Sequence, residues 1–513
     1  MQNERVNLNG AECLLHSLVA NGIDVCFMNP GTSEMQFVSA LDRVPAMRGI
    51  LGLQENICSG AADGYARVTG RPAATLLHLG PGLANALSNL HNARKARSPV
   101  VNLVGEHATQ HTAYDAPLTA DTEAFAAPVS KWVHTTTSPG DIARATAEAV
   151  RAARSAPCGV ASLVVPADHS WLAASEPAGP LPVAPLPRVE ESRIDRIAGL
   201  LAGGDAAFYV GGRALSPRGV AALGRIHRTT GARVFMNRFS ASLPRGRGRE
   251  FLVRMPYFPE VAEAAMAGVR NLILVETGEP VSFFAYPNRR STLAPLDCVI
   301  APFVSETEDS IDALERLADR FPLVPEVSVE AAIGSASGAL TLDAIGMTLA
   351  RLLPDEAIVS DEMVSSGETV NKHLVSAARH TILPVCGGSI GQGLPVAVGA
   401  AVGAPDRKVF ALEADGSGMY TLQALWTMAR EKLDVVTVIF ANRRYRILEI
   451  EMQRTGVKSI EPRAQSMLDL HDPELDWCAL ARAQGVDAAR ADTAEAFADL
   501  LQQKGPFLIE AVL

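Results

Sequence analysis

Residues 411–445 read ALEADGSGMYTLQALWTMAREKLDVVTVIFANRRY, and this stretch decides the fold. An apolar run typical of a buried strand stops at Asp415, small residues follow, and a helical pattern begins. A second apolar run ends on Asn442, 442 − 415 = 27 positions later, the length of one helix-plus-strand unit. Strands that alternate with helices form parallel sheets through right-handed crossovers. We therefore expect Asp415 and Asn442 side by side at the carboxyl edge of a sheet, where ligands bind.

The residue types at this edge suit a metal and a phosphate. One carboxylate and one amide oxygen are ligands that Mg²⁺ accepts together with phosphate oxygens. Gly416 and Ser417 open a helix that we expect to run to about Lys432, and a helix N-terminus offers free N–H groups to an anion. A plain strand–turn–helix with a capping aspartate is the alternative interpretation of this motif alone.

The same alternation of strands and helices fills the rest of the chain. Two stretches rich in proline or small residues, 177–187 and 322–338, interrupt it and are typical of linkers. We predict an α/β fold of three doubly wound parallel-sheet domains, which cover residues 1–176, 190–322 and 340–513. A chain of 513 residues is too long for one hydrophobic core, which agrees with this division.

Composition narrows the partners. The net charge of −10 and the lack of a domain-scale basic excess argue against a nucleic-acid partner. The seven cysteines are scattered without CxxC spacing, which favours reduced thiols over structural zinc. The first residues, MQNERVNLNG, lack the apolar run of a signal peptide, and no apolar stretch approaches the length needed to span a bilayer. We expect a cytoplasmic protein without a membrane partner.

Asp-Gly-Ser followed at this spacing by Asn resembles the signature of thiamine-diphosphate enzymes. The usual pattern is Gly-Asp-Gly with a later Asn-Asn, and here Ala414 and Ala441 replace one glycine and one asparagine. The resemblance implies that the cofactors are thiamine diphosphate and Mg²⁺. It also implies that Asp415, Asn442 and the main-chain carbonyl of Arg444 bind the metal, with Gly416 and Ser417 in the cofactor loop.

A second motif lies near the N-terminus. Residues 28–42, MNPGTSEMQFVSALD, and the stretch that begins LGLQENICSGAADGYAR at residue 51 resemble the pyrimidine-binding domain of the same superfamily. This part of the chain looks most like the branch that contains acetolactate synthase, benzoylformate decarboxylase and pyruvate decarboxylase. The resemblance implies that Glu55 is the activating glutamate, which hydrogen-bonds the aminopyrimidine ring and favours its imino tautomer. A surface helix residue is the alternative.

Two further stretches fit this resemblance. In CGGSIGQGLP, residues 386–395, it implies that the carbonyl of Gly388 holds the exocyclic amine and that Ile390 wedges the cofactor into its bent form. Ser365 and Ser366, in DEMVSSGE, are expected to touch the diphosphate. Ordinary loop residues are the alternative.

The resemblance also implies a reaction and a quaternary structure. The substrate would be a small-molecule 2-oxo acid that is decarboxylated, and the product is either released as an aldehyde or transferred to a second carbonyl. In this family two subunits hold the two halves of one cofactor, so we expect a homodimer or homotetramer with active sites at the interface. A flavin-dependent oxidase and a non-catalytic cofactor-binding relative are the alternatives. FAD is not expected, because residues 190–322 lack the flavin-associated pattern.

Residues for the reaction itself are less completely matched. His78, in LLHLGPG, aligns with an active-site histidine of benzoylformate decarboxylase and can exchange a proton; a buried strand histidine is the alternative. Ala285 stands where that enzyme has its second histidine, and Pro117 and Leu118 depart from the acetolactate synthase pattern. The substrate candidates are Thr32, Ser33, His107, His111, Ile447 and Leu448. Glu451, in the same region as the last two, suggests a salt bridge, an unusual substrate or a solvent-facing position.

Overall fold

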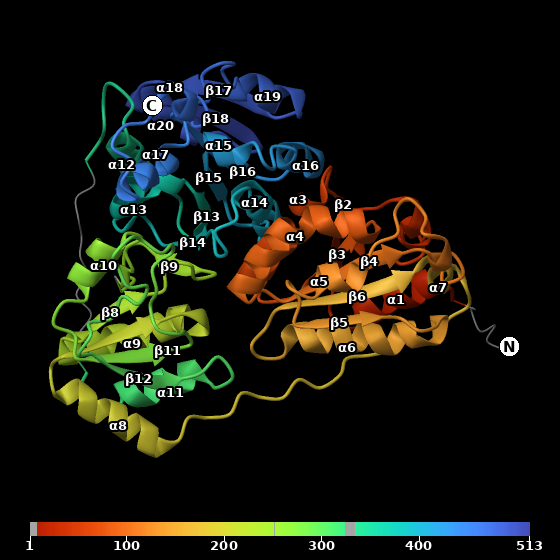
Figure 1. Ribbon diagram of the computed structural model, residues 1–513, viewed down its shortest axis with the longest axis horizontal. Helices are drawn as coiled ribbons and strands as arrows, with labels where there is room; N and C mark the ends of the chain where they lie inside the picture. The colour runs from red at the N-terminus through yellow and green to blue at the C-terminus, as the bar shows by residue number, and fades with distance from the viewer. Residues whose placement is uncertain (1–7, 251, 324–333) are drawn as a thin grey trace.

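Three sheets, each covered by helices, make up the protein (Figure 1). The structure is a computed structural model that describes residues 8–250, 252–323 and 334–513. Most of the linker expected at 322–338 therefore lies outside the described residues. The linker expected at 177–187 is extended chain that joins the first sheet region to the second.

The first sheet has six parallel strands in the order β2-β1-β3-β4-β6-β5. The strands are β1 (Val25–Asn29), β2 (Arg48–Leu51), β3 (Ala73–Leu77), β4 (Val100–Glu106), β5 (Trp132–Thr135) and β6 (Val160–Pro166). The helices and 3-10 turns are α1 (Gly10–Ala20), η1 (Thr32–Glu34), α2 (Met35–Ala40), α3 (Glu55–Thr69), α4 (Leu79–Ala96), η2 (Thr112–Tyr114), α5 (Thr122–Ala126), η3 (Pro139–Asp141), α6 (Ile142–Arg154) and α7 (Ala167–Trp171). Strands β3 and β4 are buried along nearly their whole length, as their apolar runs predicted.

The second sheet has five parallel strands in the order β10-β8-β7-β11-β12. The strands are β7 (Ala206–Val210), β8 (Arg233–Met236), β10 (Val253–Arg254), β11 (Asn271–Val275) and β12 (Val299–Val304). Its helices and turn are α8 (Glu191–Ala202), η4 (Gly212–Leu215), α9 (Pro217–Thr230), α10 (Pro259–Ala265) and α11 (Ser310–Ala318). The chain between β11 and β12, residues 276–298, is a long loop, and loops of this length in compact domains are usually functional.

The third sheet has seven strands in the order β17-β18-β16-β15-β13-β14-β9. The strands are β9 (Leu243–Arg245), β13 (Ala357–Glu362), β14 (His380–Pro384), β15 (Val409–Ala414), β16 (Val435–Ala441), β17 (Asp487–Ala491) and β18 (Phe507–Val512). Strand β9 comes from the middle of the chain and pairs antiparallel with β14, whereas the other pairs are parallel. The helices and turn are α12 (Leu342–Leu352), η5 (Val364–Ser366), α13 (Gly367–Leu374), α14 (Gly393–Gly403), α15 (Asp415–Gly418), α16 (Ala424–Glu431), α17 (Arg446–Arg454), α18 (Pro462–Gln465), α19 (Trp477–Ala483) and α20 (Ala494–Leu501).

Helices α3 and α14 join the first and third sheet regions through direct backbone contact. A Cβ atom added to Gly64 would lie 2.2 Å from the carbonyl oxygen of Val396. One added to Gly399 would lie 1.8 Å from that of Ala61. Only glycine permits this approach, so the relative position of the two sheets depends on small residues in AADGYAR and GLPVAVGA.

The predicted α/β class with three mainly parallel sheets is confirmed. Every helix within the described ranges is too short or too polar to cross a membrane.

Candidate active site

Asp415 and Asn442 lie at one edge of the third sheet, as their spacing predicted. Strands β15 and β16 are neighbours, with Ala414 opposite Phe440, and each candidate is the residue directly after its strand. One oxygen of Asp415 accepts the N–H of Gly416 at 2.8 Å, and the other accepts the N–H of Arg443. The carboxylate is therefore fixed by the backbone of both chain segments.

The Asp415 carboxylate is suited to a cation. It is 3% exposed, and burial raises its pKa, while the N–H groups of Arg443 and Gly416 lower it. Its donors among the described residues are backbone N–H groups, so its charge is not balanced by a basic side chain. The Asn442 side-chain oxygen accepts the N–H of Arg444 at 3.1 Å, and Arg444 forms an isolated bridge with Asp469 that holds its main chain. These oxygens fit Mg²⁺.

The loop after Asp415 differs from the helix expected between Gly416 and Lys432. The structure has two short helices, α15 and α16, separated by residues 419–423. The Thr421 hydroxyl donates to the carbonyl of Gly391 at 3.1 Å, so a contact distant in sequence replaces continuous helix. A Cβ atom on Gly416 would lie 2.4 Å from the Tyr445 ring.

The hydroxyl of Ser417 is engaged inside the chain, because it donates to Glu413. Glu413 lies opposite Glu362 on β13, and both carboxyls are fully buried. Glu362 accepts the N–H groups of Gly391 and Gln392, each at 2.8 Å. Burial raises the pKa of Glu362 to about 7 and raises that of Glu413 as well. Sequence reasoning did not identify this pair, although an acidic residue inside each apolar run was a visible signal.

The loop that carries Gly388 and Ile390 is held by both sheet regions. Asn92 of α4 accepts the N–H groups of Gly387 and Ser389 at 3.1 and 3.3 Å and donates to the carbonyl of Ser389 at 2.8 Å. Gly388 has a φ of +77°, and a Cβ atom there would lie 2.6 Å from the Phe283 ring. Ile390 is partly exposed. The loop is thus preformed, with Phe283 of the 276–298 loop against Gly388.

Strained backbone lies beside three of the motifs. Val364, next to Ser365, has a φ of +49°, which is an outlier for a β-branched residue. Leu79, next to His78, and Arg443, next to Asn442, have φ values of +51° and +57°. Such strain concentrates at functional sites. Ser365 and Ser366 form the turn η5 at the carboxyl end of β13.

Glu55 and His78 lie together at the carboxyl edge of the first sheet. Glu55 is the first residue of α3, and its carboxylate accepts the side-chain N–H of Asn85 at 3.0 Å. A Cβ atom on Gly82 would lie 3.3 Å from both a Glu55 carboxylate oxygen and the Cβ of His78. The small residue in LLHLGPG therefore brings the two side chains to one place.

His78 has a buried carboxylate partner that the sequence reasoning missed. The distance from His78 Nδ1 to Glu34 Oε2 is 2.8 Å, and Glu34 is fully buried. The signal for Glu34 was local: an acid three residues after Gly31, whose N–H it accepts at 2.7 Å.

Four substrate candidates follow strands of the first sheet at this same edge. Thr32 is exposed and Ser33 partly exposed, and both belong to η1 with Glu34. The rings of His107 and His111 lie 5.3 Å apart, beyond the end of β4, and His107 Nε2 is buried without a partner among the described atoms.

Ile447 and Leu448 lie in the first turn of α17, after Arg446, and Leu448 is 44% exposed. Of the possibilities for Glu451, the structure gives a hydrogen bond: its carboxylate accepts the hydroxyl of Tyr286 at 3.0 and 3.1 Å. Helix α17 therefore docks on the 276–298 loop, which also contacts Gly388 through Phe283.

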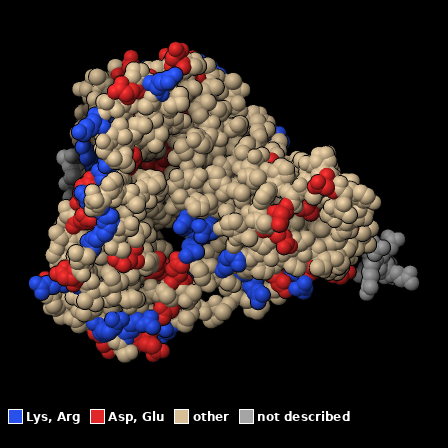
Figure 2. Space-filling model, in the orientation of Figure 1, with Lys and Arg blue, Asp and Glu red and all other residues tan. Residues whose placement is uncertain are grey.

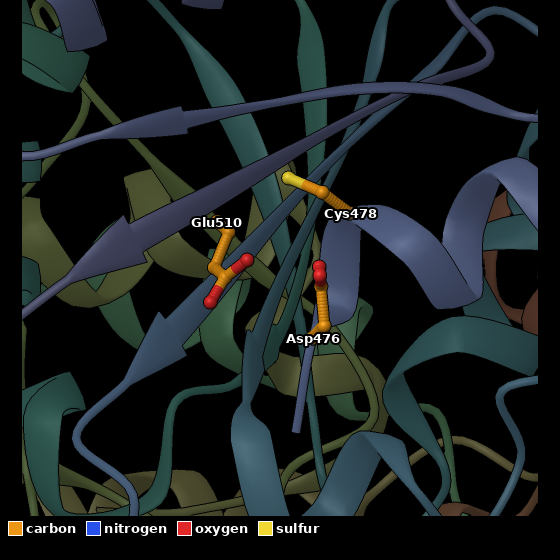
Figure 3. A group of neighbouring side chains, drawn as sticks. All are labelled: Asp476, Cys478 and Glu510. Atoms are coloured by element: carbon orange, nitrogen blue, oxygen red, sulfur yellow. The ribbon is translucent and has the colours of Figure 1, made fainter. Parts of the chain in front are cut away.

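Three side chains away from this site could in principle bind a metal ion. Asp476, Cys478 and Glu510 bring their ligand atoms within 4.8 Å of one another (Figure 3). Arg490 already donates to Glu510 at 3.0 Å, and Asp476 caps α19 by accepting the N–H of Ala479. We therefore interpret the trio as an ion-pair and helix-cap cluster.

A cavity of about 1030 Å³ lies at the carboxyl edge of the second sheet, where that region meets the end of α4. Figure 2 shows a hollow between these regions, and basic and acidic side chains side by side on this face. Two of its arginines are paired, Arg97 with Glu306 and Arg193 with Glu308, and the third, Arg196, donates to the carbonyl of Pro302. The cavity contains none of the candidate residues.

Comparisons with known proteins match both parts of the chain that carry the candidate residues, the N-terminal and the C-terminal part. Residues 8–127 match the model of the thiamine pyrophosphate enzyme N-terminal TPP binding domain, and residues 366–511 match that of the C-terminal TPP binding domain. A Mycobacterium tuberculosis protein, IlvX, provisionally named an acetolactate synthase large subunit, is 45% identical over 99% of both chains. Benzoylformate decarboxylase of Pseudomonas aeruginosa is 29% identical over 96% of both.

Solved structures show the same fold. The thiamine diphosphate-dependent 4-hydroxybenzoylformate decarboxylase of Rhodococcus jostii superposes with a TM-score of 0.84 at 24% identity, over 98% of both chains. Benzoylformate decarboxylase of Polynucleobacter necessarius also gives 0.84, at 20% identity over 99% of this chain and 98% of that one.

Proposed function

We propose that this chain, which belongs to the thiamine pyrophosphate enzyme family, decarboxylates a 2-oxo acid. The cofactors in the proposal are Mg²⁺ and thiamine diphosphate, which is another name for thiamine pyrophosphate. Within this family, the chain is an enzyme of the acetolactate synthase and benzoylformate decarboxylase type. The observation that carries the proposal is that Glu55 and His78 meet at Gly82 on the edge of the N-terminal TPP binding domain. A carboxylate for activating the cofactor and a group that exchanges protons are thereby within reach of one ligand.

The residues present fit the cofactor. Bound thiamine diphosphate would supply the carbon nucleophile and accept the electrons released with carbon dioxide. In the proposal, Asp415, Asn442 and the carbonyl of Arg444 hold Mg²⁺. The other contacts come from Ser365, Ser366, Gly416 and Ser417 at the diphosphate and from Gly388, Ile390 and Glu55 at the pyrimidine. Ser417 acts through its backbone, because its hydroxyl is bonded to Glu413.

His78 decides between two outcomes in this proposal. A histidine that delivers a proton to the reacting carbon gives a free aldehyde. When a second carbonyl compound reaches that carbon first, the product is a hydroxyketone. Thr32, Ser33, His107 and His111 would line the entrance on the His78 side, and Ile447 and Leu448 would provide apolar surface on the metal side.

We further propose a homodimer or homotetramer with the active site at the interface. Strand β6 and its parallel neighbours end beside α7, on the side away from the third sheet (Figure 1). Asp415 and Asn442 belong to the third sheet. A second copy that brings its third sheet to this edge would complete a cofactor site from two chains.

Proton NMR of the reaction products tests the function. Purified protein with thiamine diphosphate and Mg²⁺ is given pyruvate and benzoylformate, separately and together. A hydroxyketone identifies a carboligase, and aldehyde alone identifies a decarboxylase. The protein is then given a broader panel of 2-oxo acids with branched and longer side chains. The proposal is contradicted when every acid in that panel is left unchanged.

A further inference from the structure

We propose that Glu34 is the positioning residue of His78, holding its Nδ1–H so that Nε2 is the atom presented for proton exchange. This inference rests on the proposed function, in which His78 exchanges a proton with the reacting molecule. It adds a residue that neither the motif comparison nor the family resemblance supplied.

The hydrogen-bond geometry fixes the tautomer. Glu34 Oε2 lies 2.8 Å from His78 Nδ1 and 2.7 Å from the N–H of Gly31. An ionised carboxylate only accepts hydrogen bonds, so the hydrogen of a neutral His78 ring is on Nδ1. The lone pair on Nε2 is then free to take up a proton, and the protonated ring can return it from the same atom.

The packing around the pair is shaped for it. A Cβ atom on Gly31 would lie 2.3 Å from the His78 ring, and one on Gly105 would overlap Glu34 Oε1. Gly31, before η1, and Gly105, in strand β4, thus leave room for the imidazole and the carboxylate. The His78 side chain is 20% exposed, so one part of the ring still reaches the open edge of the sheet.

The surroundings of Glu34 make His78 its side-chain partner among the described residues. Burial raises the pKa of Glu34, whereas the N–H of Gly31 and the nearby His78 lower it. Glu34 Oε1 is buried without a hydrogen-bond partner among the described atoms, so the contacts of this carboxylate are those of Oε2 with the His78 ring and the N–H of Gly31. Other ionisable groups face other partners. Glu55 binds Asn85, Glu106 accepts from Thr122, Asp168 accepts from Thr109, and His169 bonds Thr136.

A purely structural role for Glu34 has a matched control in the same chain. Glu12 accepts the N–H of Asn9 three residues before it, just as Glu34 accepts that of Gly31, and it is also buried. Glu12 lies on α1. Glu12→Gln therefore removes the charge of a capping acid without changing the partner of His78.

The experiment measures the tautomer of the neutral His78 ring and the kinetics in parallel. In protein with nitrogen-15-labelled histidine, the ring signals of His78 are assigned with His78→Gln, and the chemical shifts of the two ring nitrogens tell which one carries the hydrogen. We expect the hydrogen on Nδ1 in the parent and a mixture of the two tautomers in Glu34→Gln, with turnover lowered by about a hundredfold. Binding of thiamine diphosphate, measured by calorimetry, should remain within about twofold, because Glu34 does not contact the proposed cofactor site. Glu34→Asp retains the charge and should keep more of the Nδ1–H tautomer and more of the turnover than Glu34→Gln does.

Each outcome has one meaning. The positioning role is overturned when the His78 ring has the same tautomer in Glu34→Gln as in the parent, or when Glu12→Gln changes the tautomer equally. Failure of the parent protein to bind thiamine diphosphate or consume any 2-oxo acid contradicts the proposed function instead. The ring tautomer still tests the pair in that case, because it does not depend on activity. Should Glu34→Gln not fold, the tautomer in Glu34→Asp decides, since the shorter side chain weakens the hydrogen bond.

Discussion

Asp415 and Asn442 end two neighbouring parallel strands, and the backbone after Asn442 is tied to the Asp415 carboxylate through the N–H of Arg443. The donors to this buried carboxylate are backbone N–H groups in the part of the chain that the structure describes, so its charge is available for a cation. The strand pairing, rather than the loop, therefore sets the distance between the two proposed metal ligands.

Removing the charge of Asp415 should weaken metal-dependent cofactor binding. In Asp415→Asn the hydrogen bonds can partly persist, but the ionic attraction to Mg²⁺ is lost. We expect the affinity for thiamine diphosphate with Mg²⁺ to fall by more than about tenfold in calorimetry. Asp487→Asn, at an exposed aspartate of the same sheet, is the control. Equal affinities in Asp415→Asn and the parent would place the metal elsewhere.

Glu55 should matter for turnover far more than for binding. Glu55→Gln retains the size of the side chain and can still bond Asn85, but a neutral amide cannot stabilise a proton on the pyrimidine. We expect cofactor affinity within about threefold of the parent and a fall of at least about a hundredfold in kcat. Glu123→Gln on α5, at an exposed glutamate, is the control. A Glu55→Gln protein with normal turnover would contradict the activating role.

Gly388 should tolerate no side chain while Phe283 is present. A non-glycine residue at positive φ costs about 1–2 kcal/mol, and the added Cβ would also collide with the Phe283 ring. We expect Gly388→Ala to lower the unfolding temperature and the cofactor affinity. Gly231→Ala is the matched control, because Gly231 has a φ of +73° and open space at its Cβ position.

The two contributions at Gly388 separate in a double variant. Gly388→Ala with Phe283→Ala removes the collision but not the backbone cost, so it should recover cofactor affinity toward that of Phe283→Ala alone. A double variant as impaired as Gly388→Ala would mean that the backbone conformation, not the ring, is limiting.

The sheets could be predicted from the sequence because their strands are buried on both faces and read as apolar runs between helical patterns. Strand β9 could not be predicted in this way. Its three residues, LPR, pair with His380, Thr381 and Ile382 more than 130 positions later, and no local pattern encodes such a partner. The break between α15 and α16 has a similar cause, since Thr421 bonds the distant Gly391.

The site shows the same division. The motif residues Glu55, Asp415 and Asn442 are recognisable because their chemistry is tied to short, fixed spacings. Glu34 and the pair Glu362–Glu413 gain their importance only from residues brought together by folding, 44 positions apart for Glu34 and His78. A buried acid in a strand or next to a turn is visible in the sequence, but its partner is not.

His380 should make the protein lose stability in acid. The imidazole is fully buried on β14, its Nδ1–H donates to Ala378 at 2.8 Å, and burial lowers its pKa to about 4 from an ordinary 6.5. The unfolded chain therefore binds a proton at a higher pH than the folded protein does. The contribution of neutral, buried His380 to the free energy of unfolding is fully present above about pH 6.5. It is lost as the pH falls toward 4, by about 3 kcal/mol in total.

The measurement is the free energy of unfolding of the parent and of His380→Asn, obtained by chemical denaturation at pH 7 and pH 4.5. The substitution lowers stability at both pH values through lost packing, but it should flatten the dependence on pH. Glu362, with its pKa raised to about 7, has the opposite sign, because acidification between pH 7 and 4.5 stabilises a fold that buries it. That effect is common to both proteins and cancels in their difference. His227→Asn, at an exposed histidine whose ring bonds the carbonyl of Ala232, is the control, and equal flattening there would refute the assignment to His380.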